Sequence, residues 1–210
     1  LAVFQQHVDA RGGELRVEFF GRLAHCGALV KADRHQAGLE RCDGARKDDA
    51  ALLLLDHQTG LFSLVRDFQP DEFKNNVLAL AASAKYFKLP TILTTSFEQG
   101  PNGPILPELK AMFLEAPFIP RPGQINAWDN PKWVEAIEKT GRKTLLIAGT
   151  LTNVCSESSA RDAAMLDFKT IMISDANATR SDEEHAATLI AFLQSFGDVR
   201  TTEETVGMLQ

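Results

Sequence analysis

The chain has 210 residues, 44% of them hydrophobic and 24% charged, with a formal net charge of −6. These values are typical of a globular domain, and the negative charge argues against a nucleic-acid binder, which usually carries a basic excess. No apolar run approaches the roughly 20 residues of a membrane-spanning helix, and no basic-then-apolar leader is visible, so we expect neither a membrane span nor a secretory signal.

Cysteine usage indicates a compartment. Cys26, Cys42 and Cys155 are the only cysteines. An odd and sparse set does not suit a disulfide scaffold and favours a reducing environment. We therefore expect a cytoplasmic protein.

The chain changes character near residue 48. Residues 1–48 contain no proline, whereas all nine prolines lie between Pro70 and Pro131. We interpret 1–48, with one strand-like stretch at 13–21, as an appendage of unknown role, irregular or added by cloning, and 49–210 as the main domain. Four residues of the appendage are candidate zinc ligands, but their spacing does not match a paired-ligand zinc pattern: His25, Cys26, His35 and Cys42. We expect no metal there.

The main domain alternates predicted strands and helices. Ala50–Leu55 is a continuous apolar run typical of a strand buried on both faces. Further strands are predicted at 90–96, 143–149, 169–175 and 198–201. Helices are predicted at 73–87, 131–140, 154–168, 182–196 and from 202 onward. The connections are too long for hairpins, so the pattern predicts a mostly parallel sheet covered by helices on both sides, a three-layer α/β/α Rossmann-like domain.

Two residues follow predicted strands, where ligands bind in such sheets. Asp56 follows the first strand, although a turn or cap role is equally compatible with its position. Cys155 falls in the first turn of the helix after Gly149, where free backbone N–H groups and the helix dipole favour a thiolate and could hold an oxyanion. The alternative is a small buried cysteine that packs as a hydrophobic residue.

Other candidates are weaker when taken singly. Arg121 lies between two prolines and is either an ordinary surface charge or a fixed cation for a thiolate and a carboxylate. His57 is expected to be structural, and His185 lies on a predicted surface helix. A Cys–His dyad or a histidine metal site in the main domain is therefore disfavoured. No GxGxxG, Walker or GxSxG motif is present.

Three segments carry a family resemblance. Residues 54–58 (LLDHQ), 121–128 (RPGQINAW) and 147–155 (IAGTLTNVC) occur in an order and at a spacing that resemble the isochorismatase-like cysteine hydrolases. Residues 94–98 and 125–129 look most similar to the YcaC-type branch. The resemblance covers about 49–210.

The resemblance implies a catalytic triad in which Cys155 is the nucleophile, Asp56 the general base and Arg121 the basic member. It also implies a cis peptide before Leu151 and an oxyanion hole formed by the N–H groups of Leu151 and Cys155. Most of the family has lysine where this chain has Arg121, so its role here should be purely electrostatic. The expected substrate contacts are Gln58, Asn126, Trp128 and Thr152, although Trp128 could equally belong to the core.

The resemblance further implies a homo-oligomer, with an octamer as one form, acting on a small molecule without an organic cofactor. The metal-binding Asp/His cluster of the nicotinamidase branch has no counterpart, because residues 96–105 contain no histidine. We expect no metal, no nucleic-acid partner and no membrane partner.

The leading hypothesis is a cysteine hydrolase that cleaves a small amide or other C–N bond through an acyl-enzyme. One alternative is an oligomeric binding protein with a redox-sensitive Cys155, since an exposed thiolate is what oxidants attack. Another is a hydrolase of vinyl ethers, a chemistry that does not need Cys155. The pocket shape is expected to depend on the 97–107 loop.

Overall fold

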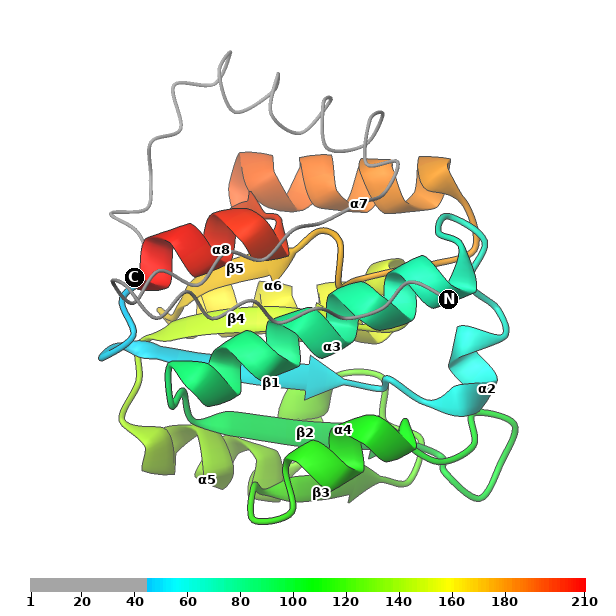
Figure 1. Cartoon of the computed structure of the whole chain (residues 1–210), viewed down its shortest axis with the longest axis horizontal. Helices are drawn as coiled ribbons and strands as arrows, with labels where there is room; N and C mark the ends of the chain where they lie inside the picture. Colours follow the sequence, from blue (N-terminus) through cyan, green and yellow to red (C-terminus); the bar gives the residue numbers. More distant parts are fainter. Residues whose placement is uncertain (1–44) are drawn as a thin grey trace, which may run out of the picture.

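A computed structural model describes residues 45–210, and the predictions made for 1–44 lie outside this range. The described part contains one six-stranded sheet in the order β3-β2-β1-β4-β5-β6, and every neighbouring pair is parallel (Figure 1). The strands are β1 (Ala50–Leu55), β2 (Thr91–Ser96), β3 (Phe118–Arg121), β4 (Thr144–Gly149), β5 (Lys169–Ile173) and β6 (Asp198–Arg200). The predicted parallel sheet is confirmed.

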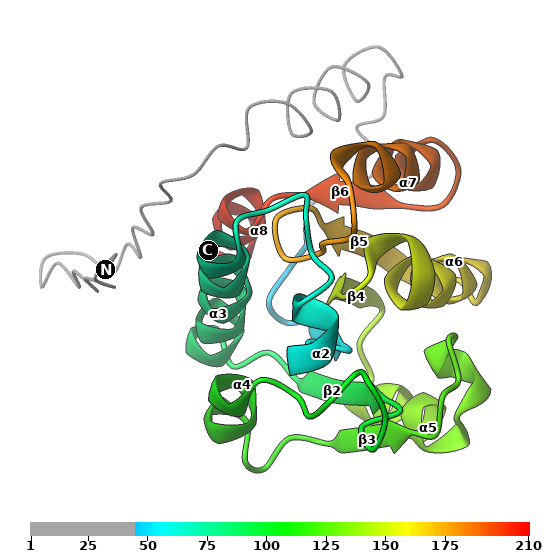
Figure 2. The same ribbon diagram turned by 90° about the vertical axis from the view of Figure 1, so that its right-hand side faces the viewer.

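Helices cover both faces of this sheet. Figure 2 shows α3, α4 and α8 on one side of the strands and α5, α6 and α7 on the other. Their bounds are α2 (Thr59–Phe62), α3 (Pro70–Tyr86), α4 (Pro107–Met112), α5 (Pro131–Thr140), α6 (Glu157–Met165), α7 (Asp182–Ser195) and α8 (Thr202–Leu209), with a 3₁₀ turn η1 (Ala127–Asp129) and a π-helical turn η2 (Thr152–Ser156). The predicted three-layer α/β/α architecture is confirmed.

The central strand β1 contributes side chains to the hydrophobic clusters on both faces of the sheet. Leu52 and Leu54 pack in the cluster that contains Phe73 of α3, whereas Leu53 and Leu55 pack in the cluster that contains Trp133 of α5. Successive side chains of a strand point to opposite faces, so a strand covered on both sides is apolar at every position. This is why β1 could be predicted from its composition.

Strand β3 was not predicted from the sequence. Pro120 lies in its middle and pairs opposite Thr95 of β2. Proline lacks an N–H and is confined to edge strands, and β3 is an edge of this sheet. Pro120 therefore argued against a strand in the sequence, although an edge strand, which pairs with one neighbour only, tolerates it. Strand β3 ends at Arg121.

Residues 45–48, which were assigned to the appendage from the sequence, contact the main domain. Ala45 is fully buried within the α3-side cluster, and the N–H groups of Asp49 and Ala50 both donate to the carbonyl of Arg46. The segment 45–48 therefore packs with the main domain.

The strand order reverses between β1 and β4, which lie side by side at the centre of the sheet. In open parallel sheets, ligands bind beyond the carboxyl ends of the strands at such a switch point. The fold therefore directs attention to the residues that follow Leu55 and Gly149.

Candidate active site

The carboxyl ends of three strands bring the predicted triad together. Asp56 follows β1, Arg121 ends β3, and Cys155 lies in η2 shortly after β4. Asp56 has φ of 55°, a left-handed conformation that non-glycine residues seldom adopt. Gly149 is the last residue of β4. A Cβ at this position would lie 2.4 Å from Ser156 Oγ, so glycine allows η2 to approach the sheet.

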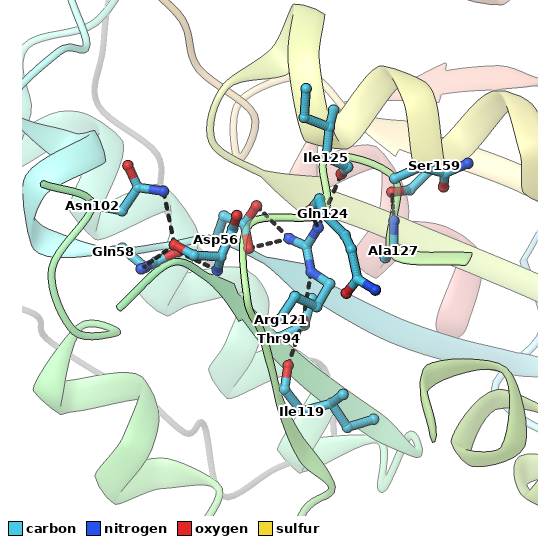
Figure 3. Close-up of polar contacts among 12 residues, drawn as sticks. Asp56, Gln58, Thr94, Asn102, Ile119, Arg121, Gln124, Ile125, Ala127 and Ser159 are labelled. Atoms are coloured by element: carbon cyan, nitrogen blue, oxygen red, sulfur yellow. Dashed lines mark hydrogen bonds and ion pairs between the residues drawn. The ribbon is translucent and has the colours of Figure 1, made fainter. Parts of the chain in front are cut away.

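Asp56 and Arg121 form a buried ion pair. Both side chains are fully buried, and Nη2 of Arg121 donates to both carboxylate oxygens of Asp56 (Figure 3). Charge-assisted hydrogen bonds of this kind are strong, and removing one partner from a buried pair leaves an uncompensated charge. The pair therefore fixes the Asp56 carboxylate in place.

The rest of the guanidinium is also engaged. Nε donates to Thr94 Oγ1 at 3.0 Å, and Nη1 donates to the carbonyls of Gln124 and Ile125, the latter at 2.9 Å. Arg121 thus ties the carboxylate to the loop after β3, as Figure 3 shows. A lysine ammonium, with three donors on one nitrogen, cannot reach these separate acceptors together.

Cys155 contacts the carboxylate of this pair. Cys155 is only 8% exposed, and its thiol lies close enough to Asp56 and Arg121 for both to shift its pKa. Burial, followed by the negative charge of Asp56, raises the pKa of the Cys155 thiol to about 12, while Arg121 opposes the rise. Burial likewise raises the pKa of Asp56, against the lowering effect of Arg121.

The prediction that the helix end lowers the pKa of Cys155 is therefore wrong for the protein without substrate. The sequence indicated the first turn of a helix, where the dipole favours a thiolate. The structure instead places Cys155 in a π-helical turn, below the surface and beside a carboxylate. Desolvation and the Asp56 charge outweigh the helix end, because both disfavour a second negative charge.

The charge balance of the triad favours proton transfer within it. With a thiol, a carboxylate and a guanidinium, the net charge is zero. Moving the proton from Cys155 to Asp56 leaves the net charge at zero, whereas losing it to solvent leaves a buried negative charge. The two acids are therefore coupled, and the thiolate is accessible when Asp56 takes the proton.

The backbone before Cys155 has the form that the resemblance implies. The peptide bond between Thr150 and Leu151 is cis. The carbonyl of Leu151 accepts from the N–H groups of Val154 and Ser156, on either side of Cys155 in the sequence. Within residues 45–210, the N–H of Leu151 donates to no backbone carbonyl.

A pocket of about 270 Å³ lies above the triad and reaches Cys155. Its lining comes from four segments of the chain: Leu61, Ser96, Phe97, Asn102, Gly123, Ile125, Thr150, Leu151, Val154 and Cys155. Phe97 and Asn102 belong to the 97–107 loop that the sequence indicated. Leu61 and Val154 were not among the expected site residues, because only the folded chain brings them into the same pocket as Cys155.

Gln58 does not line this pocket. It is fully buried, and its side-chain amide donates to the carbonyls of Ser96 (3.1 Å) and Gly103 (2.5 Å) while its oxygen accepts from the N–H of Ser96 (2.7 Å). The expected substrate contact is corrected: Gln58 holds the loop that carries Phe97 and Asn102.

Thr152 is a second correction. Its hydroxyl is fully buried and lies 2.8 Å from Nδ1 of His185, whose Nε2 lies 3.1 Å from the carbonyl of Ser174. His185 is itself buried, so the prediction of a surface position was wrong. It bonds η2 to α7, and burial lowers its pKa to about 4.

Asn126 and Trp128 also lie outside the pocket lining. The Asn126 amide donates to Asp162, and the Trp128 Nε1 donates to the carbonyl of Ser159 at 2.8 Å. The Trp128 ring packs on Phe168 with 5.5 Å between ring centroids. Both residues dock η1 onto α6, and Trp128 is partly buried against the hydrophobic cluster that contains Trp133.

His57 has the structural role expected for it. Its ring is fully buried, Nε2 lies 3.1 Å from the carbonyl of Ala176, and burial lowers its pKa to about 4. Among residues 45–210 there is no group of three or more His, Cys, Asp or Glu side chains arranged to hold a metal ion. In the same range, no helix combines the length and apolar character needed to cross a membrane.

Comparison with known proteins identifies the family. The model of the isochorismatase domain matches residues 50–204. The chain belongs to the isochorismatase family. This isochorismatase-family chain is 60% identical over 133 residues to the probable hydrolase YcaC of Escherichia coli (strain K12), an alignment that covers 63% of the chain and 64% of that protein. The chain therefore spans just under two thirds of that relative's length.

Two solved structures of YcaC proteins are similar to this isochorismatase-family chain. YcaC from Pseudomonas aeruginosa, solved with hexane-2,5-diol and covalent acrylamide, has 49% identity and a TM-score of 0.78, covering 80% of this chain and 83% of that one. The YcaC gene product of Escherichia coli, described as an octameric hydrolase of unknown specificity, has 49% identity and a TM-score of 0.79, covering 81% and 83%.

Proposed function

We propose that this protein is a hydrolase that cleaves a small amide or other C–N bond through a covalent intermediate on Cys155. The observation that carries the proposal is that the Cys155 thiol, which lines a pocket, interacts with an Asp56 carboxylate that Arg121 fixes in place. The hydrolase description of the YcaC relatives and the covalent acrylamide in the Pseudomonas protein support it.

In the proposed reaction, the Cys155 sulfur attacks the substrate carbonyl while its proton passes to Asp56. The N–H groups of Leu151 and Cys155 stabilise the negative carbonyl oxygen of the tetrahedral intermediate. The C–N bond then breaks, and the leaving amine takes the proton from Asp56. A thioester remains on Cys155.

Deacylation returns the enzyme to its starting state. Asp56 accepts a proton from a water molecule that attacks the thioester carbonyl. The C–S bond then breaks, Cys155 recovers its proton from Asp56, and the carboxylic acid leaves. Arg121 stays charged throughout and compensates whichever of Cys155 and Asp56 carries the negative charge.

The burial of Cys155 counts against the redox alternative. Oxidant-sensitive cysteines are exposed and have low pKa values, whereas this thiol is buried with a raised pKa. The vinyl ether alternative does not use Cys155, so it leaves the interaction between this thiol and Asp56 without a role. The amide hypothesis uses both features.

We also propose that the protein is a cytoplasmic homo-oligomer acting on a small molecule. The octameric state of the Escherichia coli relative supports the assembly, and the sparse, odd set of cysteines supports the compartment. Native mass spectrometry of the full chain would give the subunit number, with a monomer as the contrary result.

The nucleophile can be tested with a panel of small primary amides, followed by ammonia release and intact-protein mass spectrometry. We expect turnover in the wild type and an acyl adduct at residue 155. Cys155→Ala should lower turnover by at least about 10³-fold, as loss of a nucleophile does elsewhere. Cys42→Ala is the matched control and should leave turnover unchanged. Full activity in Cys155→Ala contradicts the proposal.

A further inference from the structure

The pocket above Cys155 is lined by uncharged groups alone. Half of its lining residues are apolar: Leu61, Phe97, Ile125, Leu151 and Val154. The rest are glycine, hydroxyl, amide and thiol residues, so no lining residue in the described part of the chain carries a formal charge. A volume of about 270 Å³ is small beside the pockets that hold drug-sized ligands.

The two charged side chains that interact with Cys155 are not free to bind a ligand. Arg121 and Asp56 are fully buried and paired with each other. The remaining guanidinium N–H groups donate to Thr94 and to the carbonyls of Gln124 and Ile125. A carboxylate entering the pocket would therefore find neither a free guanidinium nor an ammonium, which are the usual partners of such a group.

This arrangement discriminates by charge. A carboxylate loses its hydration on entering an apolar pocket and receives no counter-charge in return. A short aliphatic or otherwise apolar group gains from leaving water for the same walls. The difference in cost applies whichever bond is later broken.

We infer that the substrate is a small, uncharged amide with a short apolar acyl chain, and that Phe97, Ile125 and Val154 determine this preference. The amide part of the inference rests on the proposed function, whereas the charge preference is a property of the pocket itself. Phe97 and Ile125 are 50% and 54% exposed, so they form the rim where a ligand enters.

Two reagents test the charge preference without turnover. Iodoacetamide and iodoacetate have similar size and the same leaving group but differ in charge. The ratio of their alkylation rates at Cys155, read by peptide mass spectrometry, is compared with the same ratio for N-acetylcysteine amide. We expect the iodoacetamide-to-iodoacetate ratio at Cys155 to exceed the free-thiol ratio by at least about 10-fold, which corresponds to a free-energy difference of about 1.4 kcal/mol. A Cys155 ratio at or below the free-thiol ratio overturns the inference.

A charge at the rim provides the matched test. Ile125→Arg adds a cation next to the pocket while all three buried side chains Asp56, Arg121 and Cys155 are kept, and it should lower the iodoacetamide-to-iodoacetate ratio by about 5-fold or more. Ile125→Gln, which is polar but uncharged, should leave the ratio within about 2-fold. Phe97→Arg repeats the test at a second rim position. Unchanged ratios in both arginine variants contradict the role of these residues.

A pair of amides separates the two proposals. Butanamide and succinamate differ at the far end of the acyl chain, where one has a methyl group and the other a carboxylate. We expect hydrolysis of butanamide and at least about 10-fold slower hydrolysis of succinamate. Faster cleavage of succinamate overturns the charge preference. A high alkylation ratio with neither amide cleaved supports the pocket preference and contradicts the amidase function.

Discussion

The guanidinium of Arg121 makes hydrogen bonds in three directions, to the Asp56 carboxylate, to Thr94 and to the carbonyls of the loop after β3. The planar fork of arginine matches this set, whereas lysine concentrates its donors on one nitrogen. Arg121 therefore combines two tasks that a lysine could not perform together here: it supplies the positive charge and it shapes one wall of the pocket.

Arg121→Lys should accordingly lower turnover and the rate of Cys155 alkylation by about 10-fold to 100-fold, because the loop at Ile125 loses its anchor although the charge remains. Rates measured with iodoacetamide and the best amide substrate would show this. Arg161→Lys, on the surface of α6 and paired with Glu157, is the matched control and should behave as the wild type. Wild-type rates in Arg121→Lys would show that charge alone suffices.

At the residue scale, the sequence indicated three residues that the structure brings together, but not the protonation of Cys155. Asp56, Arg121 and Cys155 could be found because each lies in a recognisable segment at the end of a strand. The pKa of Cys155 depends on how deeply the side chain is buried and on the distance to Asp56, and neither is encoded in the local segment. The local helix-end argument therefore gave the wrong direction.

At the scale of elements, η2 carries Cys155, and a side-chain contact with α7 holds η2 in place. The carbonyl of Ser174 can only accept, so Nε2 of His185 carries the proton. With the pKa of His185 lowered, the ring is neutral and Nδ1 is an acceptor. The Thr152 hydroxyl therefore donates to Nδ1 and fastens the first residue of η2 to α7.

Thr152→Val has nearly the same shape but removes the hydroxyl that lies 2.8 Å from the buried Nδ1 of His185. We expect a loss of about 1–3 kcal/mol in the free energy of unfolding, the usual cost of an unsatisfied buried group, together with slower Cys155 alkylation. Urea denaturation and labelling rates measure the two effects. Thr152→Ser keeps the hydroxyl and should restore the labelling rate, so equal rates in the two variants would refute the anchoring role.

The elements that the sequence predicted and missed differ in how local their signals are. Apolar β1 and the helix ended by Gly141, which is in the left-handed conformation, have signals within their own residues. Strand β3 was missed because Pro120 argues against a strand unless the strand lies at an edge. The edge position depends on the order of all six strands, which the local sequence does not contain. The pocket loop likewise depends on Gln58, a residue distant in sequence from the groups it bonds.

At the scale of the whole molecule, we propose that residues 45–48 belong to the folded unit. A chain starting at residue 45 should keep the melting temperature of the folded domain. A chain starting at residue 49 loses the buried Ala45 methyl and the Arg46 carbonyl that caps the entry to β1, and it should melt roughly 3–8 °C lower. Differential scanning calorimetry decides between them, and identical melting temperatures would place the boundary where the sequence did.

The pH dependence of global stability can be tested at Asp67. Its carboxylate is buried, and Oδ2 lies 3.5 Å from Nδ1 of His185. The N–H of Thr179 donates to its Oδ2 at 2.9 Å, while Oδ1 has no hydrogen-bond partner within residues 45–210. Burial raises the pKa of Asp67 to about 7, and the charge of Asp182 adds to the rise. The folded state therefore holds a proton that the unfolded chain releases near its ordinary pKa of 3.8.

This raised pKa gives the sign of the effect. The stability contributed by the protonated carboxyl is fully present below pH 3.8 and is lost as the pH rises through about 7. Asp67→Asn is uncharged at every pH and keeps an acceptor for Thr179. Its advantage over the wild type in unfolding free energy should be near zero at pH 4 and reach roughly 2–4 kcal/mol above pH 7.5. Urea denaturation from pH 4 to 8, with the exposed Asp129→Asn as control, measures it. A constant difference across this range would mean that Asp67 titrates alike in the folded and unfolded chain.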